Sequence, residues 1–541
     1  MSTMEKQSKA IDLSHHLSDY VKSIELSPLK GLQKYFGRAD MISFAGGMPS
    51  PAYFPFASVS ADILDVDAFP LDNLREQASS PLAWLWRLFG TDKGTEHTTR
   101  VVVPKAPVAG DDGLNLATAL QYGPATGIAK TQKFIHDFTA RVHQPAYSDF
   151  ATLVHAGNTD GWSRVVKALC NPGDTIITED WTYPSAVANA TPVGVNFLPV
   201  PMDGQGMRPD SLRKLLAEWD ETKGRRPHLM YTVPVGQNPT GATMGKKRKQ
   251  EIYDLCVEYD VIICEDDPYY FLQLGDYVSK PARASEPTFD PTHELAQWIV
   301  TLEPSYLRVD YQGRVIRLET FSKTVAPGTR LGWFTCNSRF AERLERIGET
   351  TTQSPCGLGQ VLVMKLLETW SFDGYVRWLQ GIRTQYKMRR DFFIDVLADE
   401  FDLQLGTHAQ GIWAGAPVYT AYSKPTGGYF MREKSASKAL FSFVPPSSGM
   451  FLWIRLHFDA HSAFVRGTDD AESLEMQFWT QLAEGGVLTA PGHFFAALKD
   501  AELPGVASEG HLRMAFSMSE TADARRGLLI FAKTIREFFK V

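Results

Sequence analysis

Short apolar runs alternate with helix-period segments through the middle of this chain, and this pattern constrains the fold more than any other feature. The runs Leu229–Val235, Val261–Cys264 and Val315–Leu318 are typical of strands in the interior of a sheet. Apolar residues at helical spacing, from Ile252 to Tyr259, precede the second run. A helix that leads into a buried strand is half of a βαβ unit. The sequence therefore predicts an α/β domain with a mostly parallel sheet and right-handed crossovers.

The run Val315–Leu318 delivers two hydroxyls and an amine, from Thr320, Ser322 and Lys323, into a loop rich in Gly and Pro. Arg330 follows seven residues after the lysine. An amine can form a Schiff base with an aldehyde, while hydroxyls and a guanidinium bind phosphate oxygens. The combination suits a phosphorylated aldehyde, namely pyridoxal 5′-phosphate (PLP). The alternative is a surface lysine in an ordinary strand-to-loop turn.

The run Val261–Cys264 ends in three acidic residues, Glu265, Asp266 and Asp267. Ligands of open α/β sheets lie beyond the carboxyl ends of the strands. A carboxylate there can pair with a protonated pyridine nitrogen and keep the ring an electron sink. We assign this role to Asp266, and predict that Tyr269 hydrogen-bonds the ring hydroxyl. The alternative is that the acidic residues only cap the next turn.

Two further polar segments, one after a predicted strand and one before a predicted helix, are candidates for binding the cofactor. Asn238 follows Leu229–Val235 and stands before a proline, which holds it extended, so its amide is a candidate donor to the phenolic oxygen of the cofactor. Asn158 or Thr159 is placed to cap the next predicted helix, whose free amides suit a phosphate. We expect the side chain of Asp160 to point away from this anion site. An ordinary turn and an ordinary capped helix are the alternatives.

Together these residues resemble the fold-type I PLP-dependent aminotransferases, in the branch of the aromatic and 2-aminoadipate/kynurenine enzymes, and most of all the fungal aromatic ones. The matching motifs occur in the family's order. They are Ser27–Lys30, Ala45–Pro49, Phe54–Pro55, Leu120–Pro124, Glu179–Tyr183, Ser447–Trp453 and His511–Ser517. The resemblance implies a large domain with a seven-stranded, mostly parallel sheet flanked by helices, a smaller α+β domain, and a homodimer with shared active sites.

The resemblance also assigns individual roles. Tyr122 takes the place of the tyrosine that reaches the phosphate of the partner subunit, and Tyr183 that of the tyrosine that stacks on the pyridine ring. Arg513 takes the place of the arginine that binds the α-carboxylate. The residues implied at the substrate are Arg513, Asn238, Gly47 and Lys30. The chain departs from the pattern in two places: related members often have arginine where Lys30 stands, and Asn158 with Thr159 replaces a serine-rich loop.

The expected reaction is transamination with ping-pong kinetics, in which Lys323 moves the α-proton. The resemblance favours phenylalanine, tyrosine and tryptophan as donors and 2-oxoglutarate as acceptor, with 2-aminoadipate or kynurenine as alternatives. Candidate pocket residues are Tyr53, Phe54, Phe494 and Phe495. A PLP lyase or decarboxylase on the same fold would not obviously need Arg513. A ligand sensor would usually carry a DNA-binding module, and no basic helix-turn-helix pattern is visible.

Composition agrees with an enzyme of this kind. A net charge of −7 gives no basic field for nucleic acid. Five cysteines, without a CxxC motif or a His/Cys cluster, favour reduced thiols in a cytoplasmic protein and give no support for a metal site. The first 25 residues mix both charges and lack an apolar stretch, so we expect no secretory signal. No run approaches the roughly 20 apolar residues of a membrane span.

We predict four regions: an amino-terminal arm at 1–60, an insert at 61–114, a large PLP-binding domain at 115–368 and a small domain at 369–541. Inserts relative to the family lie near 62–112, 275–313 and 406–438, and no role is assigned to them. Further predicted elements are helices at Leu13–Ile24 and Val376–Phe393, and strands at Asp174–Thr178, Met450–Leu456 and Leu512–Ser517.

Overall fold

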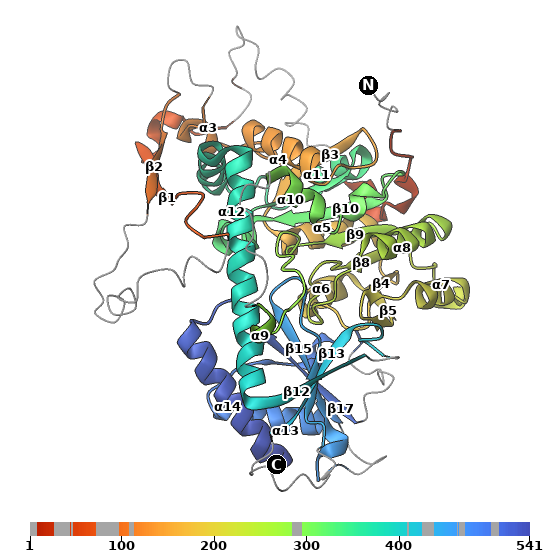
Figure 1. The fold of residues 1–541 in the computed structure, drawn as a ribbon. Coiled ribbons are helices and arrows are strands. Elements are labelled where there is room, and N and C mark those ends of the chain that lie inside the picture. Colours follow the sequence, from red (N-terminus) through yellow and green to blue (C-terminus); the bar gives the residue numbers. More distant parts are fainter. Residues whose placement is uncertain are drawn as a thin grey trace, which may run out of the picture.

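In the part of the chain that the structure describes, the computed structural model has a seven-stranded sheet, a six-stranded sheet and two two-stranded sheets (Figure 1). Helix α12 (Gly357–Glu400), which is kinked at Ser371, runs alongside the two larger sheets. The structure describes residues 8–25, 44, 47–71, 97–107, 113–283, 295–407, 411–424, 438–462, 464, 471–498 and 508–541. Within this part of the chain, no helix is both long enough and apolar enough to cross a membrane.

The larger sheet has seven strands in the order β3-β11-β10-β9-β8-β4-β5. Their bounds are β3 Phe150–His155, β11 Gly332–Asn337, β10 Val315–Thr320, β9 Ile262–Asp266, β8 Leu229–Thr232, β4 Thr175–Glu179 and β5 Asn196–Val200. Only β11 runs antiparallel to its neighbours, and the other pairings are parallel. Every residue of β4, β8, β9 and β10 is buried, because helices cover both faces. The predicted α/β fold is therefore confirmed.

Helices on the two faces of this sheet bury different sets of strand residues. One face is covered by α5 (Asn158–Leu169), α6 (Pro184–Ala190) and α11 (Ser338–Thr350). The other face is covered by α4 (Ala129–Val142), α7 (Pro209–Ala217) and α8 (Lys246–Glu258). In β9, Ile262 and Cys264 face the first layer and Ile263 faces the second, as the alternation of a strand requires.

The smaller sheet is antiparallel, in the order β12-β13-β14-β15-β17-β16. Its strands are β12 Phe401–Thr407, β13 Pro417–Ser423, β14 Phe441–Phe443, β15 Phe451–His457, β16 Ala490–Pro491 and β17 Glu509–Ala515. Helices α13 (Ala471–Glu484) and α14 (Thr521–Phe539) pack on it together with the end of α12. The predicted domain boundary at residue 368 lies within α12, three residues before Ser371, where the helical backbone is interrupted at φ 59°. The division into domains stays a prediction.

The amino-terminal segment differs from the helix predicted at Leu13–Ile24. A short 3-10 helix, η1 (Ser14–His16), is followed by α1 (Asp19–Ser23). Ser18 is extended between them: its N–H donates to the Ala168 carbonyl, and its hydroxyl caps α1. The prediction of one continuous helix was wrong because helical spacing of apolar residues does not reveal a serine that prefers a capping position.

Parts of the inserts form regular structure. A hairpin of β1 (Ser58–Leu64) and β2 (Thr98–Pro104) lies against α12, where the Trp370 indole donates to the Leu64 carbonyl at 3.0 Å. Further short α-helices and strands are α3 Leu116–Ala119, α9 Lys280–Arg283, α10 Leu295–Thr301, β6 Met202–Asp203 and β7 Gly206–Met207.

Candidate active site

The carboxyl ends of β9 and β10 meet at one edge of the large sheet. The register pairs Leu318 with Asp266, and the short helix η7 (Phe321–Lys323) follows β10 there. Asp266 accepts hydrogen bonds from Asn158 Nδ2 at 2.6 Å and from Tyr231 Oη at 2.7 Å. Burial raises the pKa of Asp266, and these two hydrogen bonds oppose the rise. A carboxyl held by neutral donors in an interior site is stabilised as the anion when a cation binds beside it.

Glu265 and Asp267 face the opposite side of β9 and do not cap a turn. The Nη1 of Arg317 lies 3.2 Å from Glu265 Oε2 and 3.0 Å from Asp267 Oδ2, and all three side chains are fully buried. Ser305 and the Tyr306 N–H also donate to Glu265. Of the three acidic residues, only Asp266 is therefore available to a ligand at the strand ends.

The amino terminus of α5 lies next to the same edge. Its N-cap residue is Gly157, at φ 88°, and a Cβ there would collide with the guanidinium of Arg330. The prediction that Asn158 or Thr159 caps this helix was wrong. Asn158 is the first helical residue, and it turns its amide to Asp266 instead; Thr159 is exposed. Asp160 points away, as expected, and binds the Ala156 N–H and Arg164.

Arg330, Ser322 and Thr320 form the other side of this anion site. Arg330 Nη1 lies 3.5 Å from Ser322 Oγ, and Ser322 Oγ lies 2.8 Å from Thr320 Oγ1. Arg330 Nη2 donates to the Ala156 carbonyl at 3.0 Å, which places the guanidinium directly before α5. Free amides at a helix start, a guanidinium and hydroxyls together suit a phosphate group.

Lys323 and Arg513 bring two cations to the site from different sheets. Burial, with the charge of Arg513, lowers the pKa of Lys323. Arg513 lies on β17, and its Nη1 donates to Asn238 Oδ1 at 2.6 Å. The rings of Phe451 and Phe495 lie 4.3 and 4.7 Å from its guanidinium. Among the described residues no carboxylate forms an ion pair with Arg513, and its buried Nε has no partner. This is a ready binding place for a carboxylate ligand.

Tyr269 and Tyr183 complete the cluster. Tyr269 is buried, and burial together with the negative charge of Asp266 raises its pKa; its phenol hydrogen-bonds the side chain of Asn238. Tyr183 immediately precedes α6 and is half-buried. It interacts electrostatically with both Tyr269 and Arg513.

Several predicted residues are not part of this cluster in the chain as described. Lys30 lies outside the described residues, while Gly47 and Tyr122 are exposed. Of the four candidate pocket residues, Tyr53 and Phe494 are exposed and Phe54 is half-buried. Phe495 is buried against Arg513.

Tyr231 was not predicted from the sequence. Its phenol lies in an otherwise apolar strand, and a buried tyrosine needs a hydrogen-bond partner. This is the one signal that could have pointed to it, but only the register of β8 beside β9 identifies the partner as Asp266.

Comparison with known proteins agrees with this geometry. Residues 91–417 match the family model "Aminotransferase class I and II". The aromatic amino acid aminotransferase C569.07 of Schizosaccharomyces pombe is 32% identical over 97% of this chain and 98% of its own length. The chain belongs to the class I and II aminotransferase family.

Two further similarities extend over nearly the whole aminotransferase. The L-tyrosine:2-oxoglutarate aminotransferase atrD of Tapinella panuoides is 30% identical over 98% of this chain and 97% of its own. The solved structure of aminotransferase Aro8 from Candida albicans covers 99% of this chain and 100% of its own, with 32% identity and a TM-score of 0.81. The aminotransferase activity predicted from the sequence is thus confirmed at the level of the family, and members of this family depend on PLP in general.

Proposed function

We propose that this aminotransferase transfers the amino group of phenylalanine, tyrosine or tryptophan to 2-oxoglutarate or another 2-oxo acid, with PLP as its cofactor. The observation that carries the proposal is one cluster of uncompensated charges. A buried carboxyl, Asp266, has only neutral partners, and two cations, Lys323 and Arg513, have no carboxylate partner among the described residues.

The residues present fit PLP. When bound, the cofactor supplies an aldehyde that condenses with amines and a protonated ring that withdraws electrons. Asp266 would pair with the ring nitrogen, because Asn158 and Tyr231 hold its carboxylate in place. Arg330 and the first amides of α5 would bind the phosphate, where the absence of a side chain on Gly157 leaves the necessary room.

The remaining groups would bind the cofactor's other edge. Asn238 and Tyr269 would hydrogen-bond the phenolic oxygen, and their mutual contact already orients both side chains. Tyr183 would stack on the ring. Thr320 and Ser322 would add hydroxyl donors to the phosphate.

Lys323 is the proposed base. Its lowered pKa, caused by burial and by Arg513, increases the neutral fraction of the amine near neutral pH, and only a neutral amine can accept the α-proton of the substrate. Arg513 would bind the α-carboxylate and so fix the Cα–H bond next to Lys323. The predicted contacts of Gly47 and Lys30 with the substrate remain predictions.

The aromatic donor is supported by the names of the S. pombe and T. panuoides relatives. In this chain Phe451 and Phe495 flank the guanidinium that would bind the carboxylate. An aromatic side chain attached to that carboxylate would meet apolar ring surface close by.

We also propose a homodimer with shared sites. Large apolar side chains are exposed on two segments of the single chain: Phe44, Met48, Tyr53 and Phe56 on the first, and Tyr122 on the second. Gln121 joins the two segments that carry them, since its amide donates to the Pro49 carbonyl at 2.8 Å. Exposed apolar surface of this kind is typical of an interface. A second copy covering it would bring Tyr122 to the partner's phosphate site. The cytoplasmic location stays a prediction.

The purified protein with a panel of amino donors and 2-oxo acids tests the proposal. The panel should include the three aromatic amino acids, 2-aminoadipate and kynurenine, with product formation and cofactor absorbance as readouts. We expect the highest kcat/KM with an aromatic donor. A higher value with 2-aminoadipate or kynurenine would overturn the aromatic assignment. Release of CO2 or of an elimination product without amino transfer would overturn the transaminase itself.

A further inference from the structure

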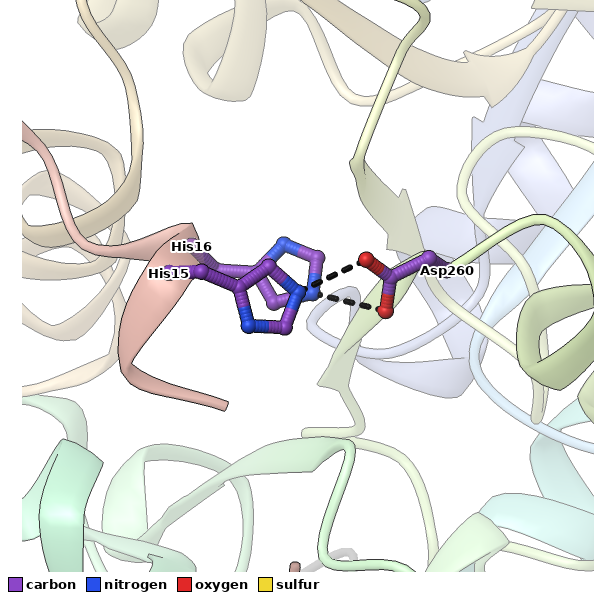
Figure 2. A group of neighbouring side chains, drawn as sticks. All are labelled: His15, His16 and Asp260. Atoms are coloured by element: carbon purple, nitrogen blue, oxygen red, sulfur yellow. Dashed lines mark hydrogen bonds and ion pairs between the residues drawn. The ribbon is translucent and has the colours of Figure 1, made fainter. Parts of the chain in front are cut away.

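Two histidines and an aspartate meet at the end of the large sheet that is remote from the active site (Figure 2). His15 Nε2 lies 2.7 Å from Asp260 Oδ2, and His16 Nε2 lies 3.1 Å from Asp260 Oδ1. Asp260 stands just before β9, whereas Asp266 ends it, so roughly 20 Å of extended chain separates the two carboxylates. The cluster therefore takes no part in the proposed chemistry.

Behind His16 a chain of polar contacts continues into the domain. His16 Nδ1 lies 3.1 Å from His228 Nδ1, and His228 Nε2 lies 3.4 Å from Asp174 Oδ2. His16 and His228 are buried, and Asp174 is mostly so. The order of groups is thus carboxylate, imidazole, imidazole, carboxylate.

A count of hydrogens shows that this row of three contacts is one hydrogen short, a deficit that either a proton or a metal ion removes. It has three contacts, and each requires one hydrogen between two acceptor atoms. Two neutral imidazoles supply one N–H each. If His16 donates from Nδ1 to His228, its Nε2 presents a lone pair to the carboxylate of Asp260. A positive ion at that outer end satisfies both acceptors at once.

The position of His15 favours a metal ion over a third proton at this place. Its Nε2 reaches the other oxygen of the same carboxylate, so two imidazole nitrogens and a carboxylate converge on one place. The three ligand atoms lie within 4.8 Å of one another. A tetrahedral zinc site needs its ligand atoms roughly 3.4 Å apart, given metal–ligand distances of about 2.0–2.1 Å. The side chains of His15 and Asp260 are about half exposed, and small rotations provide this spacing.

Arg314 is a cation that already contacts the cluster. Its Nη1 donates to Asp260 Oδ1 at 2.8 Å, which holds the carboxylate and leaves Oδ2 for another ligand. Its charge weakens the attraction for a second cation. Arg225 interacts electrostatically with Asp174, so the two carboxylates are matched by two arginines, and the affinity for a metal ion comes from its bonds to the two imidazole nitrogens and to Asp260 Oδ2.

We propose that His15 Nε2, His16 Nε2 and Asp260 Oδ2 bind one divalent transition-metal ion of the zinc type, with water as the fourth ligand. A two-histidine, one-carboxylate set favours such ions over Mg²⁺ or Ca²⁺, which prefer oxygen ligands. The His228–Asp174 pair orients His16 from behind, as outer partners of metal-bound imidazoles commonly do. The ion fastens the amino-terminal segment that contains η1 to the large domain.

The test uses the full-length, tag-free holoenzyme after chelator treatment and dialysis. Calorimetric titration with ZnCl2 should give one ion per chain, while MgCl2 should give no binding. His15→Ala should weaken zinc binding at least tenfold, and His228→Gln by about tenfold to a hundredfold. His136→Ala is the matched control, because His136 is a half-exposed histidine beside an aspartate elsewhere on the surface. It should bind zinc as the unaltered chain does.

Zinc should also raise the melting temperature of the unaltered chain and of the His136→Ala control but not that of His15→Ala. Aminotransferase activity should be the same in His15→Ala and in the unaltered chain, since the cluster is remote from the active site. Equal zinc affinity in the unaltered chain and in His15→Ala, or no binding in either, would overturn the proposal.

Discussion

Two charge clusters lie on opposite faces of the same central strands, and they are balanced in different ways. The Arg317 cluster, which comprises Glu265, Asp267, Arg317, Glu319 and Lys249, is fully buried and contains its own counter-ions. The ligand cluster, which comprises Asp266, Lys323, Arg330 and Arg513, contains opposite charges that are not paired with one another among the described residues.

The positive and negative charges within the Arg317 cluster cancel one another. Three carboxyl groups share two cations, because Lys249 lies close enough to Glu265 and Asp267 to interact electrostatically. Burial raises the pKa of Asp267, which favours its neutral form, and with Asp267 neutral the two remaining carboxylates and the two cations cancel. A cluster that cancels internally stabilises a fold, whereas one that does not is ready for a charged ligand.

The largest expected effect comes from removing the amine of the ligand cluster. Lys323→Ala should lower turnover by about 10⁴-fold or more, since the base and the covalent attachment are lost together. The circular dichroism spectrum should not change. Lys133→Ala, at an exposed lysine, is the control and should retain full activity. A near-normal rate in Lys323→Ala would refute the active-site assignment.

Removing the central cation of the Arg317 cluster should affect stability instead of chemistry. Arg317→Met leaves buried carboxylates without a partner, and the free energy of unfolding should fall by about 3–5 kcal/mol. Urea denaturation measures the loss, and turnover per folded molecule should stay within a few-fold of normal. A stable but inactive Arg317→Met would mean that this cluster acts in catalysis.

The adjacent acidic residues allow the sharpest test of the comparison. Asp266→Asn should lower turnover by about 30-fold to 10³-fold, because loss of a buried, charge-assisted contact costs about 2–4 kcal/mol. Asp267→Asn should leave turnover within about threefold of normal, since its carboxyl is already neutral below pH 7. The opposite result would show that we have assigned the wrong carboxylate to the cofactor.

If the two subunits share each active site, two different defective variants should restore activity when they are mixed. Lys323→Ala subunits mixed with Tyr122→Phe subunits should form heterodimers with one normal site, and equal mixing should restore about a quarter of the normal sites. Activity and PLP affinity report the recovery. Heterodimers that form without any gain over the parent proteins would exclude a role of Tyr122 across the interface.

The last expected effect is a pH dependence of stability that arises in the Arg317 cluster. The pKa of Asp267 is raised by burial to about 7, whereas 3.8 is its ordinary value. The folded state therefore binds more protons between these values, and the contribution of Asp267 to stability decreases as pH rises towards 7. Relative to the unaltered chain, Asp267→Asn should gain stability as the pH rises from about 4 to about 7, and the difference should stay constant above that range. Denaturation curves that stay parallel across this range would contradict the raised pKa.

Local pattern predicted the strands and the residues that follow them. Apolar runs located β8, β9 and β10, and the position of Asp266 and Lys323 at their carboxyl ends followed from the rule for parallel sheets. The sequence pattern did not show which of the three consecutive acidic residues is paired with another side chain and which is free to contact a ligand. That choice depends on Arg317 in the neighbouring strand, whose alignment with Glu265 is a property of the assembled sheet.

Other features required three-dimensional information for different reasons. Asn158 reaches across to Asp266, 108 positions away, because Gly157 takes the N-cap position. His16 and Asp260 are 244 positions apart, so no spacing rule for metal ligands connects them. Residues that are so far apart in the sequence are brought together only by the packing of the whole domain.

The hydrogen bond between Arg513 and Asn238 has a mechanical consequence, because it bridges the small and large sheets. Helix α12 consists of two segments that meet at a kink at Ser371, and the second segment, roughly 44 Å long, runs alongside both sheets. A bend in this second segment beyond Trp378, whose indole donates to the Thr324 carbonyl, would swing β17 relative to β8 and separate Arg513 from Asn238. A substrate whose carboxylate binds Arg513 while its amine lies near Lys323 would hold the small sheet and the large sheet together. Dissociation of the product would then be coupled to opening of this hinge, with release rate and interdomain motion governed by the same barrier.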